Sequence, residues 1–254
     1  MQQLKIIRGQ LFEEPCSEEA YFTTLYLRLR KAEGRIYSNC EVAELPHVPF
    51  AHPYSAEWKK RNYSCEKLLQ YLVKHPHIRN ILEVGCGNGW LTAKLSSVTK
   101  GSATGMDINR VELEQAKKVF GKLPGICFLE GDIRTGVLEE KRFDMIVFAA
   151  SIQYFPSIKE IIESALMHLT LMGEIHIIDS HFYRSTELPA ARERSRNYFI
   201  NRGIPEMINF YFHHNSNELN CFDYQLLYNP DSWLQKLKRN KSPFPWVVIK
   251  NYKY

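Results

Sequence analysis

Several features that would assign this chain to a class at once are missing from it. No stretch approaches the roughly 18 consecutive apolar residues that a membrane-spanning helix requires. Residues 1–15 show no signal-peptide pattern, and the chain has no internal repeat, low-complexity segment or long linker. These absences argue against a membrane protein, an exported protein and a repeat architecture.

Paired or metal-spaced cysteines are missing as well. The six cysteines are scattered, without the pattern of a disulfide framework or the close spacing of a zinc site. Free thiols in a reducing compartment are the simplest account, so we expect a cytoplasmic protein without a bound metal.

Length and composition are those of an ordinary globular protein. The 254 residues are 44% hydrophobic and 24% charged, which fits one domain or one domain with an appendage. The net charge of +5 is uneven, because residues 184–254 hold 11 Lys and Arg against 6 Asp and Glu. Solvated helix faces explain this excess, and attraction for an anionic substrate or a nucleic acid is the alternative.

The chain does contain a glycine-rich segment directly after an apolar run. Ile81–Val84 precedes three alternating glycines, Gly85, Gly87 and Gly89, and a helical pattern follows over residues 90–97. Glycine permits positive φ and lets a ligand approach the main chain closely. The pattern predicts a strand, a tight turn and a helix, where a nucleotide-type cofactor lies across the first strand of an open α/β sheet.

The dinucleotide fingerprint G-x-G-x-x-G is incomplete in this segment. Trp90 occupies the place of the third glycine, where an indole would block close packing around a pyrophosphate. The spacing G-x-G-x-G instead resembles the first motif of class I S-adenosylmethionine-dependent methyltransferases, of the type 11 and type 25 groups, whose cofactor has no phosphates. A glycine turn in an unrelated α/β protein is the alternative.

Four further segments in the expected order support this resemblance. Asp107 ends a second apolar segment, 22 positions after Gly85, where an acid can accept hydrogen bonds from ribose hydroxyls. A third segment ends in Gly-Asp-Ile at residues 131–133, and the fourth and fifth cover residues 143–151 and 173–180.

The apolar periodicity alternates between strands and helices over the middle of the chain. We expect strands at 80–85, 102–107, 126–130, 143–149 and 173–180, with helices at 89–97, 109–120 and 157–170. Parallel strands joined by helices imply an α/β, doubly wound sheet. Outside this region we expect helices at 17–33, 55–75 and 187–201, an irregular stretch at 34–53, and strands at 224–228 and 246–250.

The resemblance adds topology that periodicity cannot supply. It implies a seven-stranded Rossmann-like sheet in the order 3-2-1-4-5-7-6, with the last two strands in an antiparallel pairing at the edge. Residues 1–60 would form an N-terminal helical and irregular cap. Residues 61–254 would form the methyltransferase domain, with an insertion at about 181–222.

The resemblance also implies S-adenosylmethionine as the cofactor and a set of residues that bind it. Asp107 would hold the ribose and Asp132 the adenine, and the main chain near Ala149 would lie near the sulfonium. The whole set is Glu83, Gly85, Cys86, Gly87, Asn88, Gly89, Asp107, Ile108, Asp132, Ile133 and Ala149. Two alternatives stay open: Asp107 as a simple helix N-cap, and Asp132 as the cap of a turn before Arg134.

Methyl transfer depends mainly on positioning, so a catalytic base is optional. Where many relatives carry a histidine after the fourth strand, this chain has Gln153, which cannot act as a base, followed by Tyr154. Both remain candidate catalytic residues because of their position. Our first candidate for a base is His181, directly after the fifth strand, with a surface loop histidine as the alternative. His176 is expected to be a core histidine.

Residues 181–222 are rich in aromatic side chains and longer than a plain connection. Together with Tyr54, Trp58 and Arg61 they could close over the cofactor and exclude water. The pair His213 and His214 lies in this stretch, either in a lid or packed on the sheet.

Motifs of several acceptor classes are absent. No Asn/Asp-Pro-Pro-Tyr/Phe and no Pro-Cys follows the fourth strand, which argues against amino methylation of nucleic acids and covalent cytosine methylation. We therefore expect a small-molecule acceptor, no membrane partner and no nucleic acid. The alternatives are an RNA or protein acceptor on the same fold, a non-catalytic binding module, or a different nucleotide-binding oxidoreductase.

Overall fold

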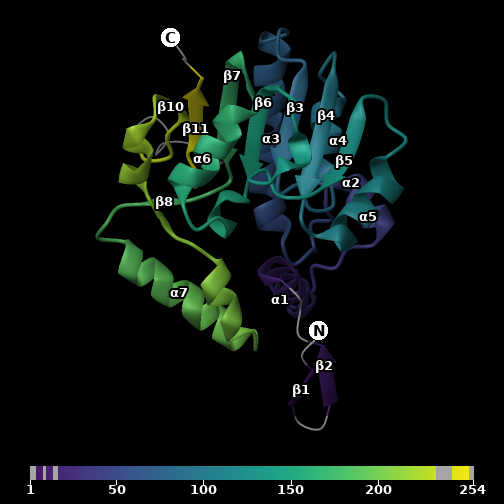
Figure 1. The fold of residues 1–254 in the computed structure, drawn as a ribbon, viewed down its shortest axis with the longest axis vertical. Coiled ribbons are helices and arrows are strands. Elements are labelled where there is room, and N and C mark those ends of the chain that lie inside the picture. The colour runs from purple at the N-terminus through teal and green to yellow at the C-terminus, as the bar shows by residue number, and fades with distance from the viewer. Residues whose placement is uncertain (1–3, 8–9, 14–16, 233–241, 252–254) are drawn as a thin grey trace.

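The computed structural model describes residues 4–7, 10–13, 17–232 and 242–251, and its centre is a seven-stranded sheet (Figure 1). The order across the sheet is β10-β11-β7-β6-β3-β4-β5. These strands are β3 (Asn80–Val84), β4 (Ser102–Asp107), β5 (Ile126–Glu130), β6 (Phe143–Ala149), β7 (Leu169–Ile178), β10 (Tyr224–Tyr228) and β11 (Trp246–Lys250).

Strand direction follows the predicted topology. Neighbours from β5 to β7 pair in parallel, whereas β11 is antiparallel to both β7 and β10. Numbered along the chain within the sheet, the order is 3-2-1-4-5-7-6, so the predicted fold class and strand order are confirmed.

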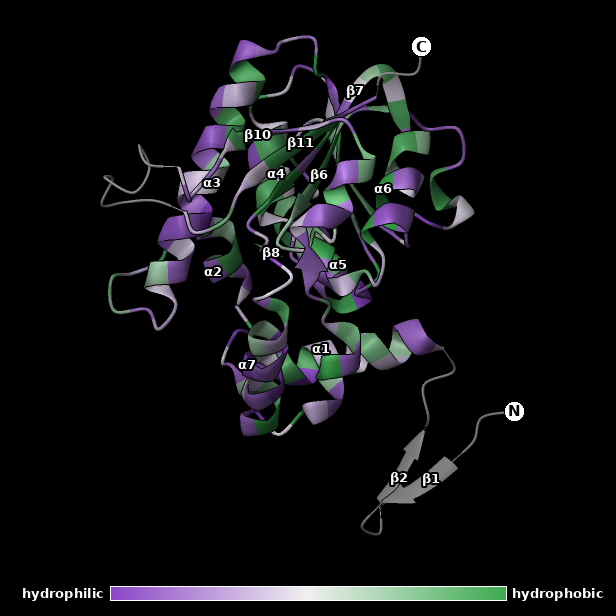
Figure 2. Ribbon diagram, turned by 90° about the vertical axis from the view of Figure 1, so that its left-hand side faces the viewer, coloured by the Kyte–Doolittle hydropathy of each residue, from purple (hydrophilic) through white to green (hydrophobic). Residues whose placement is uncertain are grey.

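Helices cover both faces of the sheet because successive side chains of its buried strands point to opposite sides. Ile81 and Met145 pack with α3, α4 and α5 on one face, and Leu82 and Ile146 pack with α6 on the other. Figure 2 shows α3 and α6 on opposite sides of the sheet. The helices are α1 (Glu18–Ala32), α2 (Asn39–Glu44), α3 (Ser55–Lys74), α4 (Trp90–Ser96), α5 (Arg110–Phe120), α6 (Ile158–Met167) and α7 (Leu188–Asn201).

Two helices far apart in the sequence, α1 and α7, lie together at one end of the sheet (Figures 1 and 2). With the short 3-10 helix η3 (Pro205–Phe210) they enclose a separate apolar cluster that includes Leu25, Leu29 and Phe199. The Tyr198 hydroxyl on α7 donates a hydrogen bond to Glu33 at the end of α1. We call α1, α7 and η3 the cap.

Minor elements complete the described chain. The N-terminal strands β1 (Leu4–Ile7) and β2 (Gln10–Glu13) form an antiparallel pair, and β8 (Phe182–Tyr183) pairs in parallel with β9 (His214–Asn215). The other 3-10 helices are η1 (Gly136–Leu138), η2 (Ile152–Tyr154) and η4 (Ser216–Cys221). Helix α3 runs through residue 60 without a break.

The predicted boundary between α6 and β7 is wrong by a few residues. The helix ends at Met167 rather than 170, and the strand begins at Leu169 rather than 173. Leu169 is buried and pairs with Phe143, whose N–H donates to the His168 carbonyl at 2.8 Å. Residues that helical periodicity assigned to the end of the helix therefore belong to the strand, because they pair across the sheet.

The stretch 34–53 is not wholly irregular, because it contains α2. Ser38 caps this helix by accepting a hydrogen bond from the Glu41 N–H, and the Glu41 carboxylate accepts one from the Ser38 N–H. This Ser-x-x-Glu capping box is readable in the sequence, so the short helix was predictable.

Candidate active site

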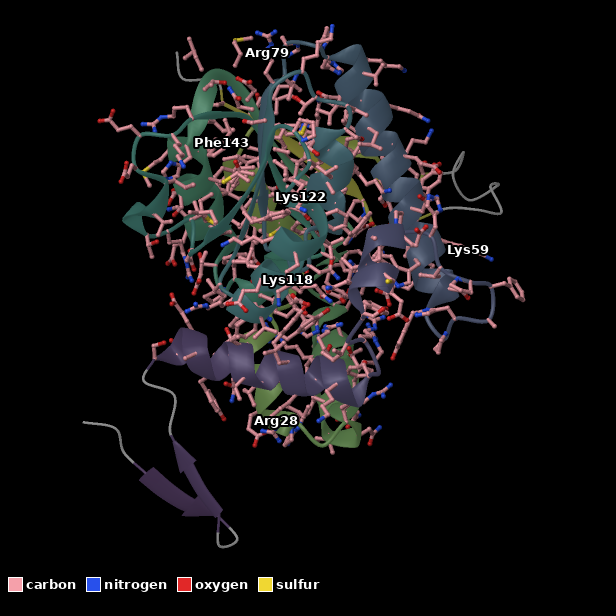
Figure 3. The ribbon with its side chains drawn as sticks, turned by 90° about the vertical axis from the view of Figure 1, so that its right-hand side faces the viewer. Arg28, Lys59, Arg79, Lys118, Lys122 and Phe143 are labelled. Carbon is pink, nitrogen blue, oxygen red and sulfur yellow. The ribbon has the colours of Figure 1, made fainter. Side chains whose placement is uncertain are left out.

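Two adjoining cavities of about 540 Å³ each lie between the cap and the carboxyl ends of the parallel strands. In Figure 3, Arg79 marks the upper end of the sheet, and α1 crosses below its lower end. Arg28 lies on the side of α1 that is turned away from the sheet. The first cavity extends from the glycine loop to residues after β7, and the second lies over the ends of β4 and β5. The cavities share the lining residues Tyr26, Gly85, Gly87, Glu112, Ala150, Tyr154 and Phe212.

The glycine loop turns tightly from β3 into α4. Gly85, Gly87 and Gly89 have φ values of 75°, 52° and 76°, in the left-handed region that glycine adopts without strain. A Cβ on Gly89 would lie 2.5 Å from the Phe128 ring, so the third position also needs glycine for packing. The Trp90 ring packs edge-on against Trp58 at 5.5 Å, toward α3.

Asp107 anchors this loop. Its Oδ2 accepts a hydrogen bond from the Gly87 N–H at 2.7 Å, and its Oδ1 accepts one from the Asn109 N–H at 2.8 Å. The N-cap of α5 is Asn109, whose side chain accepts from the Glu112 N–H, so the helix-cap alternative for Asp107 is wrong. Burial raises the pKa of Asp107, and these backbone N–H groups oppose that rise.

Asp132 and Ile133 follow β5 and line the second cavity with Ile108. The Asp132 carboxylate accepts hydrogen bonds from the Arg134 N–H at 2.8 Å and from the Arg134 guanidinium at 2.6 Å. Asp132 therefore does cap the turn before Arg134, as the alternative interpretation held. Contact with adenine remains a prediction for this residue.

The remaining cofactor candidates line the first cavity, apart from Gly89, which lies beside it in the loop. Glu83 is buried and accepts a hydrogen bond from the Thr92 hydroxyl, and burial raises its pKa to about 8. Burial also raises the pKa of the Cys86 thiol, which is therefore a neutral packing group. Asn88 and Ala149 also line this cavity.

The three candidate catalytic residues also meet in the first cavity. His181 lies edge-on to Phe244 at 4.6 Å, and burial, followed by the charges of Arg194 and Lys60, lowers its pKa, so the ring is neutral at pH 7. Tyr154 accepts a hydrogen bond from Arg30 at 3.4 Å.

Gln153 has a structural function at this site. Its amide donates to the Ala150 carbonyl at 2.6 Å and accepts from the Ser180 hydroxyl at 3.2 Å. These bonds tie together the segments that follow β6 and β7.

Two residues at the carboxyl ends of neighbouring strands have an unusual backbone conformation. Ala150 after β6 and Asp179 after β7 have φ values of 53° and 54°, which cost energy in residues other than glycine. Asp179 accepts a hydrogen bond from the Ser64 hydroxyl at 2.6 Å, and burial raises its pKa to about 6. Both residues line the first cavity.

The cap and α3 contribute charged groups that sequence reasoning largely missed. Arg30 pairs with Glu33 at 2.9 Å, Arg35 pairs with Glu57, and Arg61 pairs with Glu57 at 3.2 Å. Only Arg61 was singled out beforehand. The signal for the α1 residues is their spacing, since Tyr26, Arg30 and Glu33 share one helical face.

The described residues offer neither a membrane-spanning helix nor a metal site. No helix among them is long and apolar enough to cross a membrane. No group of three or more His, Cys, Asp or Glu side chains among them is arranged to hold a metal ion. His176 is fully buried and accepts a hydrogen bond from the Trp246 indole at 3.0 Å, which confirms its assignment to the core.

Two solved methyltransferase structures share the fold of this chain over nearly its whole length. Magnesium protoporphyrin IX methyltransferase from Synechocystis, solved with bound S-adenosylhomocysteine, has 13% sequence identity and a TM-score of 0.56, over 91% of this chain and 97% of the other. The plantazolicin methyltransferase has 15% identity and a TM-score of 0.54, over 90% and 99% of the two chains. At these identities the likeness concerns the fold.

The sequence comparison finds a family match over part of the chain. Residues 81–173 match the family described as a methyltransferase domain. The chain is 38% identical over 80 residues to a malonyl-(acyl-carrier protein) O-methyltransferase of Halalkalibacterium halodurans, covering 30% of each protein. It is 29% identical over 79 residues to the phthiotriol/phenolphthiotriol dimycocerosates methyltransferase of Mycobacterium tuberculosis, covering 31% of this chain and 29% of the relative.

The chain therefore carries a class I S-adenosylmethionine-dependent methyltransferase domain, and S-adenosylmethionine is the cofactor of this family. The matched stretches span about a third of the length of these two curated relatives.

Proposed function

We propose that this protein transfers a methyl group from S-adenosylmethionine to a small-molecule acceptor bound in the first cavity. One observation carries the proposal: a single cavity connects the glycine loop, the ends of β6 and β7, and His181, beneath the cap. Its volume of about 540 Å³ is typical of small-molecule sites. A cavity of this size that is partly covered by a helical cap suits a small acceptor better than a polymer.

The residues present fit the cofactor. A Cβ on Gly87 would approach the Glu112 carboxylate to 2.9 Å, so the glycine keeps the space above the loop open. Asp107 and Ile108 would hold the ribose and adenine in the second cavity, with Asp132 and Ile133 beside them. Glu83, Gly85 and Asn88 would border the methionine part in the first.

The bound cofactor supplies an electrophilic methyl group on a sulfonium. The protein aligns the acceptor with that group and excludes water, for which the aromatic residues Tyr26 in the cap, Tyr154 in η2 and Tyr211 after η3 are placed. Neutral His181 can take a proton from the acceptor where one must be removed.

Calorimetric titration of the purified protein tests this proposal. We expect micromolar binding of S-adenosylmethionine and S-adenosylhomocysteine and no binding of NAD. Mass spectrometry of the denatured protein detects any cofactor that co-purified. Binding of NAD alone, or of none of the three by ligand-free protein, would overturn the assignment. Formation of S-adenosylhomocysteine with an acceptor panel then tests turnover.

A further inference from the structure

Glu112, in the first turn of α5, is a charged group at the site that the predicted cofactor set does not include. It lines both cavities at their junction. Its Oε2 lies 2.9 Å from the point where a Cβ on Gly87 would stand, so the carboxylate lies over the glycine loop. This position lies between Asp107, which would hold the ribose, and the residues that would border the methionine part of the cofactor.

The Glu112 carboxylate lacks a protein partner. Within the described chain it makes no hydrogen bond and no ion pair, although its backbone N–H is bound by Asn109. Glu114, two residues on, is exposed and pairs with Arg110 at 3.1 Å. The carboxylate is partly exposed where it lines the two cavities, so it is free to interact with a ligand bound there.

Charges of both signs surround the Glu112 carboxylate. Arg30 and Arg61 face Glu112 from α1 and α3, but each is already paired with a glutamate of its own. Asp107 on β4 adds negative charge, and Tyr26 is a neutral neighbour. Burial, followed by the charge of Asp107, raises the pKa of Glu112 to about 7, and the two arginines oppose this rise.

We propose that Glu112 is a further cofactor-binding residue, whose carboxylate faces the cationic part of S-adenosylmethionine and favours it over S-adenosylhomocysteine. This inference rests on the proposed function. The two molecules differ by one methyl group and by the positive charge on sulfur. A nearby carboxylate is attracted to that charge in the substrate and loses the attraction once the methyl group has left. Glu112 would thereby help product leave.

The test compares wild type with Glu112→Gln, which removes the charge and keeps the shape. Dissociation constants for S-adenosylmethionine and S-adenosylhomocysteine are measured by calorimetry at pH 6 and pH 8. Glu114→Gln is the matched control on the same helix, and Glu112→Asp keeps the charge. A thermal unfolding scan of each variant verifies that it is folded.

In Glu112→Gln at pH 8 we expect the preference for S-adenosylmethionine over S-adenosylhomocysteine to fall about tenfold, or ~1.4 kcal/mol. In wild type, affinity for S-adenosylmethionine should rise from pH 6 to pH 8 as Glu112 ionises, and the variant should show a smaller rise. Glu112→Asp should retain the preference, and Glu114→Gln should match wild type.

Two results would overturn this inference while leaving the proposed function intact. One is unchanged binding of both ligands by Glu112→Gln, and the other is a loss of the same size for both. If wild type binds neither ligand, the proposed function fails and this inference fails with it.

Discussion

Asp107 combines two tasks at the level of the single residue. It holds the Gly87 and Asn109 N–H groups, and its position at the end of β4 suits the ribose hydroxyls. We expect Asp107→Ala to weaken S-adenosylmethionine binding by about 1–3 kcal/mol, because buried hydroxyls lose a charged acceptor. Calorimetry measures the change.

Asp144 provides a matched control for that substitution. It also accepts two backbone hydrogen bonds, from Arg79 and Asn80 at 2.9 Å, but at the opposite end of the sheet. Asp144→Ala should reduce stability and leave cofactor affinity unchanged. Equal affinity losses in the two variants would indicate that Asp107 acts only through the fold.

His181 is the candidate base, and its lowered pKa makes it neutral at pH 7. For an acceptor that must lose a proton, His181→Ala should lower kcat by about 10²-fold and leave cofactor affinity unchanged. The wild-type rate should rise with pH up to the lowered pKa and then level off. Steady-state kinetics with exposed His47→Ala as control measures this, and normal turnover by His181→Ala would exclude the base role.

At the level of the element, the packing of α4 on the sheet depends on Gly89. An added Cβ would meet the Phe128 ring at 2.5 Å in a residue with φ of 76°. Gly34 has a φ of 68° but no atom within 4 Å of such a Cβ. We expect Gly34→Ala to cost about 1–2 kcal/mol of unfolding free energy, from the left-handed backbone alone.

Gly89→Ala should cost about 1–3 kcal/mol more than that, because overpacking adds to the backbone cost. Urea unfolding of both variants measures the difference. Equal losses would show that Phe128 moves aside freely and that backbone conformation alone requires glycine there.

At the level of the whole molecule, a buried polar cluster joins α3 to the middle of the sheet. Glu174 on β7 accepts hydrogen bonds from Tyr71 at 2.5 Å and from His176 at 3.1 Å. Burial alone would raise the pKa of Glu174, but these bonds outweigh it and lower the pKa to about 2. Burial lowers the pKa of His176.

We expect this cluster to make the stability of the fold fall at acidic pH. Glu174 takes up a proton near its ordinary pKa of about 4.3 in the unfolded chain, but only near pH 2 in the folded one. Its stabilisation is therefore complete above pH 5 and is lost as the pH falls toward 2. We expect Glu174→Gln to lower the free energy of unfolding by on the order of 2 kcal/mol at pH 7, and by progressively less below pH 4.

Urea unfolding at several pH values measures that difference. The raised pKa values of Glu83 and Asp179 favour the folded state at lower pH, which is opposite to the effect of Glu174. Both groups are present in wild type and variant, so the difference between the two proteins reports on Glu174 alone. A constant difference between wild type and variant across the range would contradict the ionic role of Glu174.

Local sequence determined the repeating strands and helices, the glycine loop and the acids at strand ends. Hydrophobic periodicity and glycine's conformational freedom act within a few residues, so they can be read directly. Periodicity did not give the order of the last two strands, which came from the family resemblance. It also placed the end of α6 too late, because pairing of Leu169 with Phe143 decides where β7 begins.

Only the tertiary structure decided how the site is enclosed and charged. Helices α1 and α7 meet through Leu29, Phe199 and the Tyr198–Glu33 hydrogen bond, a contact between distant segments that no local pattern specifies. The same packing brings Arg30 to Tyr154. Burial and neighbouring charges set the pKa of Glu112 at the glycine loop, because both depend on which distant residues surround the carboxylate once the chain has folded.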